Sequence, residues 1–474
     1  MIIVYIFLLL ILIVVVRALS FNSKGNNNIQ KEEIIFDSKK AISNLQKLVQ
    51  CKTVSYIDST LEDKKEFTKL IKLLPKLYPN IYKIVENIKI EDRAILLHWK
   101  GKNSDNPTVL MSHYDVVEAD EKEWDKPAFE GLIEDGILWG RGSLDTKVTL
   151  NGILYAADCL VKEGFVPNND IYFAFSGKEE IGGPGAKNIV NYFKENGITP
   201  SFVLDEGGAV LNDVFPGVNK PCGFVGIAEK GYIDLKLSIK SNGGHSSTPT
   251  KPTPIEELSK AVVAIEKHPF KMKLTSPTLL MLDKMGRRTT FIYKIIFSNL
   301  WLFKGLFDLY CRKNGGQLDA LVRTTSVFTK MRGSNSANVI PSNPYMYANI
   351  RIIPDSSIEE TVNYIKKIIN NDNIELTIEN PEEPSVVSTI ECDGYKKICE
   401  AIESTWDNSF TSPYLMNQCS DSKNYGVISN KVFRFSAVDM TNEEVDSIHG
   451  NNEHIRLETI IKNVEFFIRL IKKC

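Results

Sequence analysis

Residues 171–185 read IYFAFSGKEEIGGPG, and this stretch decides the fold of the chain. The apolar run over 171–176 has the length and composition of a buried strand. A loop with glycines and two adjacent acids follows, and helical periodicity then covers residues 186–196. The glycines permit the tight backbone that such a loop needs. A buried strand that leads through a polar loop into a helix is the repeating unit of an α/β protein.

The same unit recurs on both sides of this stretch. Apolar runs at 94–98, 108–112 and 202–204 predict further strands, and a helix is expected at 147–162. Strands that alternate with helices form mostly parallel sheets with helices on both faces. The sequence therefore predicts the α/β class.

The pattern changes near residue 230. Residues 232–240 (YIDLKLSIK) alternate in polarity with a period of two, which is typical of a strand with one exposed face. Helices are expected at 254–267 and 357–370, and further strands at 325–331, 345–352 and 374–378. This composition predicts a small α+β domain inserted into the α/β domain.

The chain is thus divided into five predicted segments. They are a signal peptide or signal anchor at 1–20, a linker at 21–37, a first part of the α/β domain at 38–228, the insert at 229–382 and a second part of the α/β domain at 383–474.

Composition excludes several classes of protein. Of the 474 residues, 43% are hydrophobic and 24% are charged, which argues against disorder and against a bundle of membrane spans. The net charge of −2 gives no reason to expect a nucleic-acid partner. The eight cysteines form no CxxC pair, which excludes a structural zinc knuckle and leaves disulfide pairing open.

Residues 1–16 (MIIVYIFLLLILIVVV) form an unbroken apolar run. This run is shorter than the roughly 20 residues of a membrane span, so it favours a signal peptide cleaved after Ser20. An uncleaved anchor is the alternative. Either interpretation predicts the secretory pathway, with the protein secreted or membrane-anchored and its α/β domain lumenal or extracellular.

Residues 292–310 (IYKIIFSNLWLFKGLFDLY) are rich in aromatic residues and leucine. They predict either a buried pair of helices or a surface for a lipid, an acyl chain or a membrane.

Three acids or acid pairs and one histidine fall at the carboxyl ends of successive predicted strands, and a second histidine lies late in the chain after a polar stretch. The motifs are SHYD with His113 and Asp115, GRGSLD with Asp145, KEE with Glu179 and Glu180, DEGG with Asp205, and IHGNNE with His449. Taken singly, each has an ordinary explanation, such as a helix N-cap or a solvated acidic turn. Together they should meet, because open α/β sheets gather their ligands at the carboxyl ends of the strands. Mixed imidazole and carboxylate donors suit zinc or a similar divalent ion.

The motif order HxD, GRGxxD, EExGG, DEGG and IHGxNE resembles the M20 family of metallopeptidases over residues 40–474. The details are most similar to the branch of carboxypeptidase S and the PM20D1-like N-fatty-acyl-amino-acid synthases/hydrolases. The resemblance implies a zinc-peptidase-type sheet, a lid or dimerisation domain in the insert, and two zinc ions per subunit.

The resemblance also implies roles for individual residues. Asp145 would bridge both ions, and Glu179 would be the general base. The first ion would be held by His113 and Asp205, and Asp115 would orient the His113 ring. The second ion would be held by Glu180 and His449.

The insert carries further implied roles. His245, in the segment GGHSS, would stabilise the oxyanion, in some relatives from a partner subunit, so a homodimer is left open. Asn338 and Arg351 would hold the substrate carboxylate. Asp421 and Ser422 lie in QCSDS, where the family has a turn similar to GGTDS, so this sequence lacks that glycine and threonine.

These roles predict a dizinc hydrolase of amide bonds next to a free carboxylate. Its substrate would be a short peptide, as for a carboxypeptidase, or an N-acyl amino acid, which it would hydrolyse or synthesise. The alternative is a catalytically silent lumenal binding protein that keeps the fold.

Overall fold

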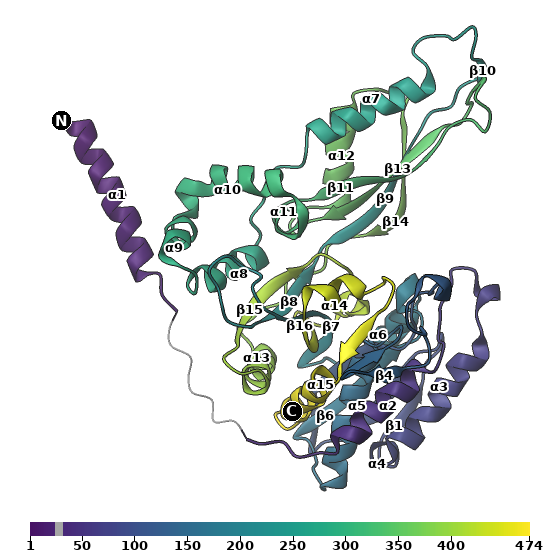
Figure 1. The fold of residues 1–474 in the computed structure, drawn as a ribbon, viewed down its shortest axis with the longest axis vertical. Helices are drawn as coiled ribbons and strands as arrows, with labels where there is room; N and C mark the ends of the chain where they lie inside the picture. The colour runs from purple at the N-terminus through teal and green to yellow at the C-terminus, as the bar shows by residue number, and fades with distance from the viewer. Residues whose placement is uncertain (24–31) are drawn as a thin grey trace.

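The computed structural model describes residues 1–23 and 32–474. Residues 24–31 of the predicted linker (21–37) therefore lie outside the described residues. Figure 1 shows an α/β domain at one end of the molecule and the inserted domain at the other, with the N-terminal helix projecting from the side.

An eight-stranded sheet forms the centre of the α/β domain. Its order is β1 (Glu86–Lys89), β2 (Ile95–Trp99), β6 (Asn169–Ser176), β3 (Asn103–His113), β7 (Phe202–Leu211), β16 (Val432–Met440), β8 (Cys222–Glu229) and β15 (Phe410–Met416). β3 runs parallel to β6 and β7, β7 parallel to β16, and β8 parallel to β15, whereas β1 and β2 are antiparallel additions at one edge. The predicted mostly parallel sheet is confirmed.

Helices cover both faces of this sheet because the strands are apolar on both sides. One face packs against α2 (Ser38–Val49), α3 (Lys64–Leu77), α4 (Pro79–Tyr82), α5 (Lys147–Lys162), α13 (Asp393–Thr405) and α15 (Leu457–Ile471), and the other against α6 (Gly185–Glu195). Within β2, Leu97 faces the first group and Leu96 faces α6. The helix predicted at 147–162 is confirmed.

A second, four-stranded sheet forms the insert, here called the lid. Its order is β11 (Thr325–Arg332), β13 (Tyr345–Ile352), β9 (Gly231–Ser238) and β14 (Glu375–Glu382), with α7 (Pro254–Lys267) and α12 (Ile358–Ile369) on its buried face. Burial alternates along β9 and β13, as the sequence pattern predicts. Two short strands, β10 (Gly244–His245) and β12 (Val339–Ile340), pair at the far tip of the lid (Figure 1).

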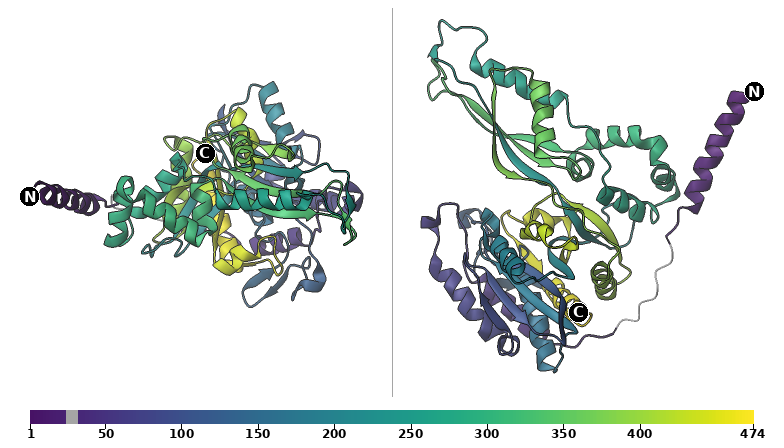
Figure 2. Two further views of the ribbon diagram at one scale, coloured as in Figure 1. Left: turned by 90° about the horizontal axis from the view of Figure 1, so that it is seen from above. Right: turned by 180° about the vertical axis from the view of Figure 1, so that it is seen from behind.

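The remaining elements lie around these two sheets. They are α1 (Ile2–Ser20), α8 (Ser276–Gly286), α9 (Phe291–Ser298), α10 (Leu300–Asn314), α11 (Gly316–Val322), α14 (Asn442–Ser447), and the small sheet of β4 (Leu132–Glu134), β5 (Ile137–Trp139) and β17 (His454–Arg456). Both views of Figure 2 show α1 projecting away from the rest of the molecule. All eight cysteines are free thiols.

Candidate active site

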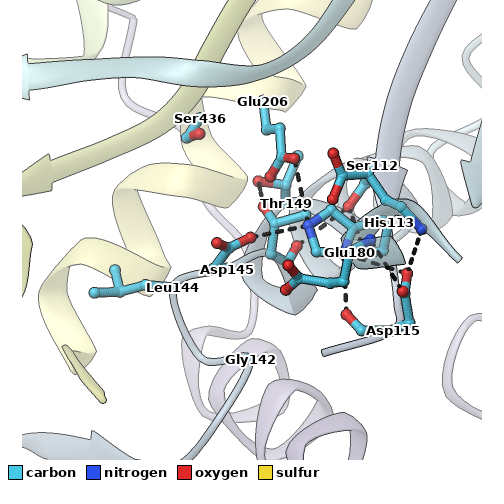
Figure 3. Close-up of polar contacts among 12 residues, drawn as sticks. Ser112, His113, Asp115, Gly142, Leu144, Asp145, Thr149, Glu180, Glu206 and Ser436 are labelled. Carbon is cyan, nitrogen blue, oxygen red and sulfur yellow. Dashed lines mark hydrogen bonds and ion pairs between the residues drawn. The ribbon is translucent and has the colours of Figure 1, made fainter. Parts of the chain in front are cut away.

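The α/β domain brings one histidine and several acids together at the carboxyl ends of three neighbouring strands. His113 ends β3, Glu179 and Glu180 follow β6, and Glu206 lies in β7. Because β6, β3 and β7 are adjacent in the sheet, their ends meet at one place. Asp145 joins them from the loop before α5, as Figure 3 shows.

His113 is fully enclosed and both of its ring nitrogens have partners. Nδ1 lies 2.9 Å from the backbone carbonyl oxygen of Asp115, so this nitrogen carries the proton. Nε2 lies 2.9 Å from Asp145 Oδ1 and 3.3 Å from Glu206 Oε1. A histidine held in this way presents Nε2 as the metal-binding atom.

Asp115 orients this site through its backbone and its side chain. Its carboxylate accepts hydrogen bonds from the backbone amides of Glu179 at 3.1 Å and Glu180 at 3.2 Å, and from the Ser55 hydroxyl. Its carboxylate oxygen is 3.6 Å from His113 Nδ1. Asp115 therefore fixes the loop of the two glutamates as well as the histidine ring.

Asp145 stands between the two histidines that the sequence singles out. Its Oδ1 faces His113, and its Oδ2 lies 3.0 Å from His449 Nε2, which also lies 3.1 Å from Glu180 Oε2. The Asp145–Thr146 peptide is cis. One aspartate thus shows one oxygen to each of two sets of donors.

Glu453, which has no role in the sequence prediction, holds the Asp145 loop. Its carboxylate accepts hydrogen bonds from the amides of Leu144 at 2.8 Å and Asp145 at 3.1 Å, and pairs with Arg141 at 2.8 Å. The sequence could have indicated a role for Glu453, because Glu453 is the last residue of the IHGNNE motif that contains His449.

Glu206, rather than Asp205, is the acid of β7 that reaches the cluster. Adjacent residues of a strand point to opposite sides. Glu206 Oε1 approaches His113, while the Asp205 carboxylate turns away and accepts a hydrogen bond from the Ser422 amide at 3.0 Å. The geometry thus disagrees with the role that the resemblance gives Asp205, and the DEGG motif holds both candidates.

Two groups of donors lie close enough to hold an ion. One comprises His113, Asp145 and Glu180, and the other His113, Glu179 and Glu206, and within each group the donor atoms lie within 4.8 Å of one another. Glu180 Oε1 is buried and has no hydrogen-bond partner among the described residues. Imidazole and carboxylate donors with an unpaired buried oxygen fit a divalent cation of the zinc type.

The charges of the cluster support the same conclusion. Burial raises the pKa of Glu206 to about 8 and that of Glu179 well above its ordinary value. Burial alone would lower the pKa of His113, but the carboxylates of Glu206, Asp115 and Asp145 raise it. Hydrogen bonds to Asp145 and Glu180 raise the pKa of His449 to about 10. The site therefore concentrates negative charge that a bound cation would offset.

The predicted substrate turn lies beside the cluster. Asp421 and Ser422 are buried, and burial raises the pKa of Asp421 to about 7. The Ser422 hydroxyl donates to Glu229 at 3.1 Å, and Glu229 pairs with the buried Arg434 at 2.7 Å. This ion pair fixes the turn in spite of its unusual sequence.

Arg351 lies at the root of the lid, next to the same turn. Its Nη1 donates to the Cys419 sulfur at 3.5 Å, and its guanidinium lies 4.5 Å from the centre of the Tyr232 ring. The structure therefore places this cation beside the predicted substrate turn.

His245 and Asn338 lie elsewhere, at the tip of the lid. Both are exposed, and the amide of Ser246 donates to the Asn338 carbonyl at 3.1 Å. His245 Nδ1 accepts a hydrogen bond from the Ser247 amide at 3.1 Å. Figures 1 and 2 show this tip far from the α/β domain, so the fold of one chain does not bring these two residues to the acids.

Known proteins share both the sequence and the fold. Residues 109–473 match the family model for peptidase family M20/M25/M40. The chain is 35% identical to the probable carboxypeptidase S-like 2 of Dictyostelium discoideum, over 90% of this chain and 84% of that protein. It is 31% identical to the N-fatty-acyl-amino acid synthase/hydrolase PM20D1 of Xenopus tropicalis, over 92% and 86%.

Solved structures agree with the architecture. The M20 metallo-carboxypeptidase Sso-CP2 of Sulfolobus solfataricus superposes with a TM-score of 0.66 at 17% identity, covering 91% of this chain and 98% of that one. Human carnosine dipeptidase 1 superposes with a TM-score of 0.63 at 13% identity, covering 92% and 96%. The predicted family resemblance is confirmed, and the chain belongs to peptidase family M20/M25/M40 as an enzyme of that metallopeptidase type.

Proposed function

We propose that the chain is a dizinc hydrolase of amide bonds that lie next to a free carboxylate. One observation carries this proposal: Asp145 presents one oxygen to His113 at 2.9 Å and the other to His449 at 3.0 Å. Two ions that share this aspartate would then be completed by Glu206 on the side of His113 and by Glu180 on the side of His449. Glu206 takes the place that the resemblance gives to Asp205.

Bound divalent ions would supply a water molecule of lowered pKa and would polarise the scissile carbonyl. Glu179 would take the proton of the attacking water and return it to the leaving amine. Asp115 holds the backbone of Glu179 in position, with 3.1 Å between its carboxylate and the Glu179 amide. Desolvation raises the pKa of Glu179, which favours a group that must both accept and release a proton.

Arg351 supports the preference for a free carboxylate. Its guanidinium is a cation at the lid root beside the turn of Asp421 and Ser422, and guanidinium groups bind carboxylates through two parallel hydrogen bonds. Carboxypeptidases and N-acyl-amino-acid hydrolases both act on such substrates. Both kinds of name occur among the relatives, so we keep both substrate classes.

His245 and Asn338 would enter the site from a second copy of the chain. Their exposed position at the lid tip leaves them free to reach across to the α/β domain of a partner, as an oxyanion donor and a substrate ligand. A homodimer would therefore complete each site. The secretory pathway remains the proposed location, with α1 as its signal or anchor.

The test is hydrolysis of glycyl-leucine and of N-oleoyl-phenylalanine by the purified chain, before and after treatment with a chelator. We expect one of the two to be cleaved, the chelator to stop cleavage, and added Zn²⁺ to restore it. The matched variant Glu179→Gln should keep its metal and lose turnover, because its side chain can no longer accept the proton. The relatives do not favour a silent binding protein, and absence of cleavage of either substrate would revive that alternative.

A further inference from the structure

The helices α9 and α10 expose an apolar surface that the proposed catalytic function does not use. Its largest members are Ile292, Trp301, Leu302, Leu306, Leu309 and Tyr310, here called the platform. Ile292 is 71% exposed, Leu306 66% and Trp301 59%. Apolar side chains that cluster at such exposure mark a binding surface.

The platform is one continuous face of α10, with the opposite face already buried. Leu302, Leu306 and Tyr310 recur at intervals of four residues, so they lie in one row along the helix. On the opposite face, Phe307 and Cys311 are buried in a cluster with Val322. A helix at the surface of a soluble protein has a polar outer face, whereas α10 is apolar on both.

The second observation is the position of α1, which is docked against α9. Arg17 Nε donates to the Ser298 carbonyl at 3.0 Å, and Asn299 Nδ2 donates to the Val14 carbonyl at 3.2 Å. Ala18 is fully buried in this contact. The C-terminal end of α1 is therefore fixed beside the platform, as Figure 1 shows.

The rest of α1 extends outward with its apolar side chains exposed. The helix has 19 residues and a mean hydropathy of 3.2, and it is long and apolar enough to cross a membrane. At about 1.5 Å per residue its length approaches the roughly 30 Å of a bilayer's hydrocarbon core. The platform thus lies where a membrane that contains α1 would begin.

Charge and residue type fit the same surroundings. Residues 270–323 contain ten lysines and arginines but three aspartates, in a chain whose net charge is −2. Aromatic side chains with basic neighbours are typical of helices that lie in the interface of an anionic membrane. Trp301 and Tyr310 have the ring types that are enriched at that depth.

We propose that α9 and α10 lie in the lipid–water interface of an anionic membrane, with α1 retained as the anchor beside them. A bilayer covers α1 and the platform together, whereas a protein bound to the platform would leave α1 in water. These helices belong to the insert in sequence, but α8 and α10 pack in one apolar cluster with β8 and β15 of the α/β domain. The edge of the α/β sheet at β15 is then the side of the enzyme that faces the membrane. This inference does not depend on which amide the enzyme hydrolyses.

The experiment uses the fluorescence of Trp301 in the full-length chain. Of the five tryptophans, Trp99, Trp124 and Trp406 are buried in the α/β domain and Trp139 is half-buried there, so Trp301, at 59% exposure, is the exposed reporter of the platform. The chain is reconstituted in vesicles of phosphatidylcholine and phosphatidylserine whose acyl chains carry bromine, which quenches indoles in contact with lipid. We expect quenching of the wild type and loss of that quenched fraction in Trp301→Phe.

A second variant separates the platform from the anchor. Leu306→Glu with Leu309→Glu should abolish quenching of Trp301 while the chain still sediments with vesicles through α1. Ile57→Glu, at a side chain 94% exposed on the α/β domain, is the matched control and should leave quenching unchanged. Equal quenching in wild type and Trp301→Phe would overturn the proposal, and so would an unquenched Trp301 in the wild type. If the chain with unquenched Trp301 is dimeric in detergent, a second copy of the chain covers the platform instead of lipid.

Discussion

The floor of the α/β domain and the tip of the lid hold functional residues in opposite ways. On the floor, His113 and the acids are enclosed, and Asp115 and Glu453 fix their loops through backbone amides. At the tip, His245 and Asn338 are exposed. His245 lies in the two-residue strand β10, and Asn338 directly precedes the two-residue strand β12. One folded chain brings the residues of the floor together, whereas the role proposed for the tip would require the tip to approach an α/β domain, in the same chain or in a second one.

The largest expected effect tests which acid of β7 belongs to the floor. Glu206→Gln should lower kcat by about 1000-fold or more and reduce the bound metal, because it removes an anionic donor facing His113. Asp205→Asn is the matched control, since its carboxylate is bonded to the Ser422 amide at 3.0 Å instead. Metal content by elemental analysis and kcat check both variants. The opposite ranking would return the ligand role to Asp205.

The next effect tests whether the tip acts across two chains. His245→Ala should lower kcat by about 100-fold, the cost of losing one oxyanion donor, and leave the metal content unchanged. Mixing it with Glu179→Gln should restore about a quarter of wild-type activity, because half of the dimers formed hold one intact site.

Mixtures that stay inactive after subunit exchange would instead favour closure of the lid within one chain. The exchange itself is checked by mass measurement of differently tagged subunits, so that failure to mix is distinguished from failure to complement.

The same contrast explains what the sequence could predict. Strand ends in one parallel sheet converge by rule, so the strand pattern predicts that His113, Glu179 and Glu180 meet. Asp145 lies in the loop before α5 and His449 in the loop after α14, and the place of His449 is expected from the family resemblance. The choice between Asp205 and Glu206 depends on which of the two side chains projects from the face of the sheet that holds the cluster, and two adjacent acids in a motif carry no information about that. The distance of His245 from the floor depends on how the two domains are oriented, which follows from no local pattern.

Arg351, at the root of the lid, stands between the two regions, and its substitution should have a smaller effect. Arg351→Lys keeps the charge but loses the paired donors, so KM should rise about 10-fold while kcat changes little. Arg332→Lys, at an exposed position of the lid strand β11, is the control and should leave KM unchanged. An unchanged KM in Arg351→Lys would place the carboxylate site elsewhere.

The smallest effect concerns the pH dependence of stability, which should arise on the floor and not at the tip. In the metal-free chain, burial raises the pKa of Glu206 from 4.5 to about 8 and that of Asp421 from 3.8 to about 7. At a pH between the ordinary pKa of each group and its raised pKa in the folded chain, the folded chain binds more protons than the unfolded chain. The stability of the folded chain therefore falls as the pH rises from about 4 to about 8.

We therefore expect the melting temperature of the metal-free protein to drop by about 1 °C for each kcal/mol lost across this window. Bound metal should flatten the profile, because the cation stabilises the ionised acids. Glu206→Gln removes one of the titrating groups and should give a shallower slope, whereas His245→Ala should leave the slope of the wild type. A slope that His245→Ala changes as much as Glu206→Gln would mean that the tip already contacts the floor in the folded chain, and the separation of the two regions would be lost.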